Sequence, residues 1–311
     1  MRLSLLFTAW LALSASPLYA QDTETLTAPH YHTPYAHYAN NLQPVQAVPA
    51  VSVTPLLQNL PPQLRSEIAY VQDLASATPL YQKNSDTVRP IASITKLMTA
   101  LVVVEARQDM AEMLEISTED IDRLKKTTSR LSVGSKLSRA DMLHLALMSS
   151  ENRAANALGR YYPGGLAAFV RAMNDKARAL GMRQTHFVEP TGLSSENVSS
   201  PRDLVALMQA TAKQPLIHKY STSEQYIVEP KPGRQLVFGN TNRLVQNDNW
   251  KIQVSKTGFI NESGQCLVLL TTFEGRDIAI VLLNAQGRAT RVADAIRVRS
   301  LVEGSNKLAM L

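Results

Sequence analysis

The order of helical and strand-like patterns along this chain constrains its fold more than any other feature. Short apolar runs at 68–71 and 80–81 flank a polar stretch, as expected for a β-hairpin. Between about 105 and 214 apolar residues recur at helical spacing, over 141–148, 152–158 and 166–180. Beyond residue 226 the pattern is typical of strands, at 226–228, 236–238, 252–254, 267–272 and 278–283, and a final helix is expected over 288–302.

This order predicts an α/β fold of the α+β type. A central antiparallel sheet would be built from both ends of the chain and flanked by helices. The helical segment between the two groups of strands would form a separate lobe. A site is expected in the cleft where this lobe meets the sheet.

The first chemical motif, Ser93-Ile94-Thr95-Lys96, opens an apolar, helix-like run soon after Pro90. Spacing of i to i+3 on a helix puts both side chains on one face. Ser93 is therefore a candidate nucleophile and Lys96 its general base, which must be neutral when it acts. Burial and the second cation Lys256 would both lower the Lys96 pKa. Alternatively, Ser93 is an ordinary helix cap and Lys96 a solvated lysine.

The second motif, Ser150-Glu151-Asn152, belongs to a Ser-Ser-Glu-Asn tetrapeptide that recurs at 194–197. We select the first copy because it follows an apolar helix and lies at a tight junction with the next, whereas the second lies in a polar loop. Ser150 is expected to pass a proton to a leaving amine, and Asn152 to bind substrate. Alternatively, these residues only cap the following helix.

The third motif, Lys256-Thr257-Gly258, follows an alternating strand. Lysine and threonine side chains there can hold a substrate carboxylate, and glycine lets a substrate lie against the strand. The N–H groups of Phe259 and Ser93 could together stabilise an oxyanion.

Together the three motifs resemble the signature of penicillin-binding proteins and serine β-lactamases. The chain is most similar to the low-molecular-mass penicillin-binding proteins, which are serine D,D-peptidases. The resemblance implies a β-lactamase/transpeptidase-like fold. It extends to Arg89-Pro90-Ile91-Ala92-Ser93, Glu189-Pro190-Thr191-Gly192-Leu193, Asn240-Thr241-Asn242 and the stretch 256–268. This last stretch resembles the D-alanyl-D-alanine endopeptidase branch (penicillin-binding protein 7 type), and the chain after Gly258 has room for only two strands and one helix.

The resemblance implies hydrolysis of D-alanyl–diaminopimelyl cross-links in peptidoglycan through a Ser93 acyl-enzyme, with β-lactam antibiotics as covalent inhibitors. Two alternatives remain: a D,D-carboxypeptidase that removes terminal D-Ala, and a non-catalytic β-lactam-sensing or wall-binding module. A class A β-lactamase is disfavoured. Glu189 invites the comparison, but Leu193 stands where that family has Asn.

The remaining features indicate an exported protein. Residues 1–20 resemble a signal peptide, 21–62 a flexible tether and 63–311 the peptidase domain, so we expect a periplasmic protein with no stable membrane anchor after cleavage. The net charge of +6 comes without basic runs interleaved with aromatics, and nucleic-acid binding is not expected. The single cysteine, Cys266, is expected to be a buried, inert thiol. No metal or cofactor is implied.

Overall fold

The computed structural model describes residues 63–309, with side chains described as far as residue 304. The predicted signal peptide (1–20) and tether (21–62) lie outside the described residues. Within this part of the chain, no helix combines the length and apolar character needed to cross a membrane.

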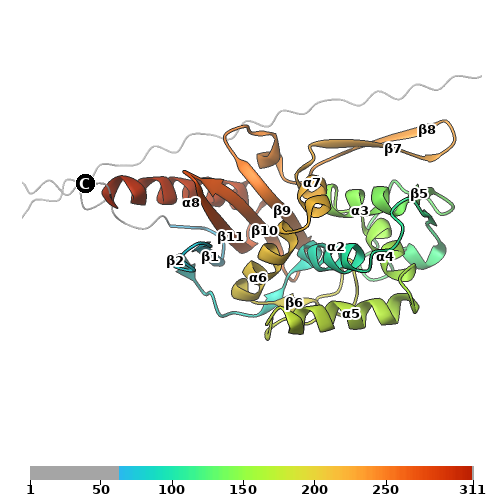
Figure 1. Ribbon diagram of the computed structural model, residues 1–311, viewed down its shortest axis with the longest axis horizontal. Coiled ribbons are helices and arrows are strands. Elements are labelled where there is room, and N and C mark those ends of the chain that lie inside the picture. Colours follow the sequence, from blue (N-terminus) through green and yellow to red (C-terminus); the bar gives the residue numbers. More distant parts are fainter. Residues whose placement is uncertain (1–62, 310–311) are drawn as a thin grey trace, which may run out of the picture. The chain divides into compact units, whose positions relative to one another are not determined.

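A five-stranded antiparallel sheet forms the centre of the fold, with strand order β2-β1-β11-β10-β9 (Figure 1). Its strands come from both ends of the described chain, as predicted: β1 (Ile68–Asp73), β2 (Pro79–Lys83), β9 (Lys251–Ile260), β10 (Gly264–Phe273) and β11 (Arg276–Ala285). Strand β9 is therefore an edge strand. Its free edge is available to other groups.

The sheet is buried on both faces because its apolar residues alternate between two cores. Along β10, Val268 and Leu270 face the core shared with the helical lobe, whereas Leu267 and Leu269 face the other core. That second core contains Ala295, Val298 and Val302 of α8 (Arg288–Ala309), which covers one face of the sheet (Figure 1).

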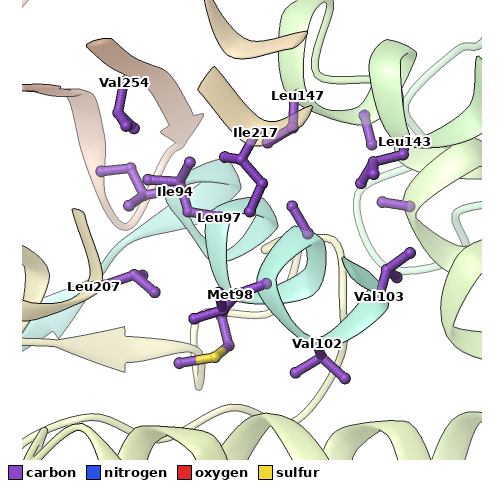
Figure 2. Packing of buried hydrophobic residues seen from close by; sticks show 14 of the residues in the cluster. Ile94, Leu97, Met98, Val102, Val103, Leu143, Leu147, Leu207, Ile217 and Val254 are labelled. Atoms are coloured by element: carbon purple, nitrogen blue, oxygen red, sulfur yellow. The ribbon is translucent and has the colours of Figure 1, made fainter. Parts of the chain in front are cut away.

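Helix α2 (Thr95–Glu105) passes through the interior between the sheet and the lobe. All of residues 95–103 are buried, since the helix is apolar around most of its circumference. Figure 2 shows side chains that line the path of α2 and the turn before it, which come from α3, α6, α7 and β9: Leu143, Leu147, Leu207, Ile217 and Val254. Any group at the start of α2 is thereby held in a fixed position.

The helical lobe lies between the two groups of strands in the chain, as predicted. It contains α3 (Arg139–Met148), α4 (Asn152–Arg160) and α5 (Gly165–Ala179), with the short strands β4 (Met113–Glu115) and β5 (Lys136–Ser138) paired beside them. Ser138 caps α3 in a capping box with Asp141. Helices α6 (Pro201–Ala212) and α7 (Pro215–Thr222) follow, each with proline at its start.

One expectation about the sheet is wrong. Strands β7 (Gln225–Lys231) and β8 (Arg234–Gly239) pair only with each other and form a separate hairpin. Ile227 and Val237, which pair across it, are 53% and 46% exposed. Strands with one exposed face cannot lie inside a sheet covered on both sides. Their local pattern identified them as strands, but it did not identify their partners.

The turn before α2 is held by close backbone contacts. Ser93 lies in the 3₁₀ turn η1 (Ala92–Ile94), directly before α2, and Ala92 has a left-handed φ of 48°. A Cβ on Gly192 would lie 1.9 Å from the Ala92 carbonyl oxygen, and one on Gly258 would lie 2.9 Å from that of Ile91. Both positions therefore require glycine.

We expect Leu97→Ala to lower the free energy of unfolding by about 2–5 kcal/mol, because it leaves a cavity in a close-packed core. Leu124→Ala is the matched control: Leu124 is 67% exposed, so its loss should stay within about 0.5 kcal/mol. Urea unfolding followed by circular dichroism measures both. Equal losses would contradict the central position of α2.

We expect Gly192→Ala to destabilise the protein far more than Gly275→Ala. Both glycines have left-handed φ angles, of 80° and 77°, so both variants carry backbone strain of about 1–2 kcal/mol. Nothing lies within 4 Å of an added Cβ at Gly275, whereas at Gly192 the Cβ would collide with the turn that holds Ser93. The difference between the free energies of unfolding of the two variants, measured in urea, gives the cost of the collision alone. Similar losses would show that this turn can shift freely.

Candidate active site

The three motifs meet at one cleft of about 620 Å³ between the edge strand β9, the turn η1 and the junction of α3 with α4. The predicted residues Ser93, Ser150, Asn152, Thr257, Gly258 and Phe259 line this cleft. Lys96 and Lys256 are buried next to it. The structure thus brings together all eight residues that the sequence singled out.

Lys96 is fully buried, and its amine is surrounded by acceptors. Nζ lies 2.9 Å from Ser93 Oγ, 2.7 Å from Asn152 Oδ1 and 2.6 Å from the Thr191 carbonyl oxygen. Burial lowers the Lys96 pKa to about 8, although the charges of Glu189 and Glu151 oppose this shift. About one tenth of the amine is therefore neutral at pH 7, far more than for an ordinary lysine.

These contacts orient the neutral amine. Carbonyl and amide oxygens can only accept hydrogen bonds. The two hydrogens of a neutral Lys96 are thus taken up by Asn152 Oδ1 and the Thr191 carbonyl. The nitrogen lone pair is then directed at Ser93 Oγ, the remaining neighbour, whose hydroxyl can donate to it. This is the geometry that a general base requires.

Ser150 lies between α3 and α4 in a left-handed conformation, with φ of 61°. Such a conformation is costly for a non-glycine residue and often marks a functional site. Its hydroxyl accepts a hydrogen bond from Lys256 Nζ at 3.0 Å, and the same amine donates to the Thr257 carbonyl at 3.0 Å. Burial lowers the pKa of Lys256 well below its usual value, and the charges of Lys96 and Arg291 lower it further.

The neighbouring residues of the second motif have structural contacts as well. Glu151 caps α4 by accepting from the Arg153 N–H. Asn152 donates from Nδ2 to Thr127 Oγ1 at 3.1 Å while its oxygen accepts from Lys96. Asn152 therefore ties the helical lobe to the amine of Lys96. The capping alternative is correct for Glu151, and it does not account for Ser150 or Asn152.

Sequence reasoning assigned no role to several residues that complete the site. Thr257 Oγ1 donates to Thr241 Oγ1 at 2.7 Å, so two hydroxyls stand together on the wall of the cleft. Arg291 is buried against strands β9 and β10. Its Nη1 donates to the Gly258 carbonyl at 3.3 Å and to Gln265 Oε1 at 2.8 Å. Thr241 lies in one of the stretches that carry the family resemblance, which was the available signal. Arg291 carried no signal beyond its place in the last predicted helix.

Glu189 is fully occupied in holding its own loop. Its carboxylate accepts hydrogen bonds from the Gly192 N–H at 2.6 Å and from Asn197 Nδ2 at 2.9 Å, and also from both the N–H and hydroxyl of Thr191. Asn197 belongs to the second Ser-Ser-Glu-Asn copy and is fully buried. The second copy is thus a structural element that fixes the Glu189 loop against α2.

Cys266 is buried in β10, and burial raises the pKa of its thiol. Among the residues that the structure describes, no three His, Cys, Asp or Glu side chains gather as they would around a metal ion.

Comparison with known proteins identifies the family of this chain and several of its relatives. Residues 56–287 match the family of D-alanyl-D-alanine carboxypeptidases (Peptidase_S11). A D-alanyl-D-alanine endopeptidase of Escherichia coli (strain K12) is 48% identical over 243 residues, which is 78% of this chain and 78% of that protein. A D-alanyl-D-alanine endopeptidase of Pseudomonas aeruginosa is 49% identical over 242 residues, again 78% of each chain.

Solved structures share the fold. The Streptomyces K15 DD-transpeptidase superposes with a TM-score of 0.72 at 26% identity, covering 78% of this chain and 98% of that one. Penicillin-binding protein D2 of Listeria monocytogenes, in its ampicillin-bound form, has a TM-score of 0.65 at 28% identity, covering 77% and 98%. These matches confirm the predicted fold class, and together with the relatives they confirm the predicted class of enzyme, a serine D,D-peptidase near the endopeptidase branch. The chain belongs to the D-alanyl-D-alanine carboxypeptidase family, Peptidase_S11.

Proposed function

We propose that this protein is a periplasmic D,D-endopeptidase that hydrolyses D-alanyl–diaminopimelyl cross-links of peptidoglycan through an acyl-enzyme on Ser93. The observation that carries the proposal is the geometry of Lys96. Its buried amine has two acceptors for its hydrogens and the Ser93 hydroxyl facing its lone pair. A helix-cap serine beside a solvated lysine would need no such arrangement.

In the acylation step, Ser93 Oγ attacks the D-alanyl carbonyl carbon as its proton moves to Lys96 Nζ. Negative charge develops on the carbonyl oxygen, where the N–H groups of Ser93 and Phe259 stabilise it. The C–N bond then breaks, and the leaving amine takes the proton of the Ser150 hydroxyl. Ser150 regains the proton that left Ser93, passed from Lys96 by way of Lys256, which is hydrogen-bonded to Ser150, so Lys96 is neutral again when the ester has formed. The acyl group remains on Ser93 as an ester.

Substrate binding uses the wall of the cleft next to Ser150. The amine that leaves in a D,D-peptide carries a carboxylate on its α-carbon. Lys256 and the paired hydroxyls of Thr257 and Thr241 provide a cation and donors for that carboxylate. Because the carboxylate favours a protonated Lys256, its binding also favours the neutral form of the nearby Lys96, by repulsion between the two charges.

Water then hydrolyses the ester, with Lys96 again the nearest available base. Glu189 is unsuited to activate this water, since its carboxylate is taken up by five donors of its own loop. A penicilloyl ester on Ser93 should therefore be released slowly, and β-lactams should act as covalent inhibitors.

Preference for cross-links over terminal D-Ala is the finer part of the proposal. Its support is that the two relatives at nearly half identity are both named D-alanyl-D-alanine endopeptidase. A periplasmic location rests on the predicted signal peptide at 1–20, and the peptidase domain is proposed to span 63–311. A carboxypeptidase acting on terminal D-Ala would use the same chemistry.

Incubation with ampicillin should add one drug mass to the intact wild-type protein, on Ser93, and none to Ser93→Ala. On purified cross-linked muropeptides, the wild type should convert dimers to monomers, and Ser93→Ala should be inactive. Ser195→Ala, in the exposed part of the second tetrapeptide copy, is the control and should react normally. Loss of terminal D-Ala without loss of dimers would favour the carboxypeptidase. Full biological effect of Ser93→Ala would favour a non-catalytic module.

The rate constant of acylation by a β-lactam should rise with pH and level off above about 8, the pKa of Lys96. Below that pKa the neutral fraction of the amine falls about tenfold per pH unit, so the rate should follow it down. Stopped-flow measurements from pH about 6 to about 9 provide the profile. Lys96→Arg, whose guanidinium stays protonated, should not be acylated at any of these pH values. A flat profile for the wild type would exclude Lys96 as the base.

A further inference from the structure

The cleft that holds Ser93 is strongly cationic. Four basic side chains line it, and no acidic side chain does: Lys125, Arg243, Arg288 and Arg291. Lys125 is paired with Glu262, and Arg291 is buried against β9 and β10. Arg243 and Arg288 are exposed to solvent, and within the described part of the chain no hydrogen bond or ion pair engages either side chain.

Arg243 is held in place by its neighbours in the chain. It begins the 3₁₀ turn η3 (Arg243–Gln246), which Asn242 caps. Asn242 Nδ2 donates to Ser255 Oγ at 2.9 Å, and Thr241 Oγ1 accepts from Thr257 Oγ1 at 2.7 Å. The residues before Arg243 are thus fixed to the two residues of β9 that flank Lys256. Arg243 therefore lines the cleft from a fixed backbone position beside the proposed carboxylate site.

Arg288 and Arg291 lie at the start of α8, whose first turn contains no acidic residue. Positive charge at a helix N-terminus is electrostatically unfavourable, since the helix dipole already favours an anion there. Arg291 is also only 6% exposed, and its Nε has no partner among the described residues. Arg288 and Arg291 together therefore leave an excess of positive charge on this side of the cleft.

The two candidate reactions differ in the charge of the group that leaves. A carboxypeptidase releases a single D-amino acid, which has one carboxylate. An endopeptidase releases a diamino acid that belongs to a second stem peptide with further carboxylates. If Lys256 and Thr257 hold the carboxylate next to the scissile bond, a binding site for the others requires an additional, unpaired cation nearby.

We propose that Arg243 binds a second carboxylate of the leaving peptide and so determines the preference for cross-linked substrates. This inference rests on the proposed function of the cleft. Arginine is suited to the role because its planar guanidinium can bind a carboxylate through two hydrogen bonds. Arg288 supplies a further positive charge in the same cleft.

The test compares two substrates. For Arg243→Ala, kcat/KM on a purified cross-linked muropeptide dimer should fall about tenfold, the effect of losing one charged hydrogen-bonded contact. On a pentapeptide ending in D-Ala-D-Ala, the change should stay within about threefold. Arg243→Lys should recover part of the activity on the dimer. Arg183→Ala, which removes the same charge from an exposed position outside this cleft, should equal the wild type on both substrates.

The outcomes separate the two proposals. Wild-type protein that trims the pentapeptide but leaves dimers intact would overturn the proposed endopeptidase function itself. Wild-type protein that cleaves dimers, with Arg243→Ala equally active on them, would overturn only the role of Arg243. Equal losses on both substrates would also overturn it, because they would show a general effect on the site. Thermal unfolding of each variant identifies a loss of folded protein.

Discussion

The burial of one amine determines most of what this structure can do. Lys96 lies in the interior at the start of α2, where its Nζ is satisfied by Asn152, Thr191 and Ser93. Those three partners come from three different regions of the chain. An unsatisfied buried amine would be very costly, so the helical lobe, the Glu189 loop and the nucleophile turn must all be in place together. The same burial lowers the pKa that makes the amine a base.

The rest of the fold supports this arrangement. Helix α2 is surrounded by side chains from the sheet and the lobe, as Figure 2 shows, and cannot shift without disturbing both. Gly192 and Gly258 let two backbone segments approach the Ser93 turn closely. Strand β9, at the edge of the sheet, then presents the third motif to the open cleft. Precision at the site is thus a property of the packed interior.

Much of this was predictable from sequence. Apolar runs over 267–272 and 278–283 identified central strands, because a strand that is buried on both faces is apolar at nearly every position. Helical periodicity over 141–148 and 166–180 identified α3 and α5. The hairpin of β7 and β8 was recognised as two strands and assigned to the wrong sheet, because periodicity carries no information on pairing partners. The helix α7 was not predicted, since only Ile217 and Ser221 of its residues are buried and they form no apolar stripe.

The sequence by itself determined which residue types are available for the chemistry and in which order the elements occur, since these depend on local pattern and short motifs. Sequence context already favoured the first Ser-Ser-Glu-Asn copy for the site, and only the tertiary structure decided that the second copy fixes a loop. It likewise decided that Glu189 is occupied and that Thr241 stands beside Thr257. It also left Arg243 without a hydrogen-bond or ion-pair partner among the residues that the structure describes. The reason is physical. Burial, pKa and hydrogen-bond partners depend on residues far apart in the chain, and they exist only once the chain has folded.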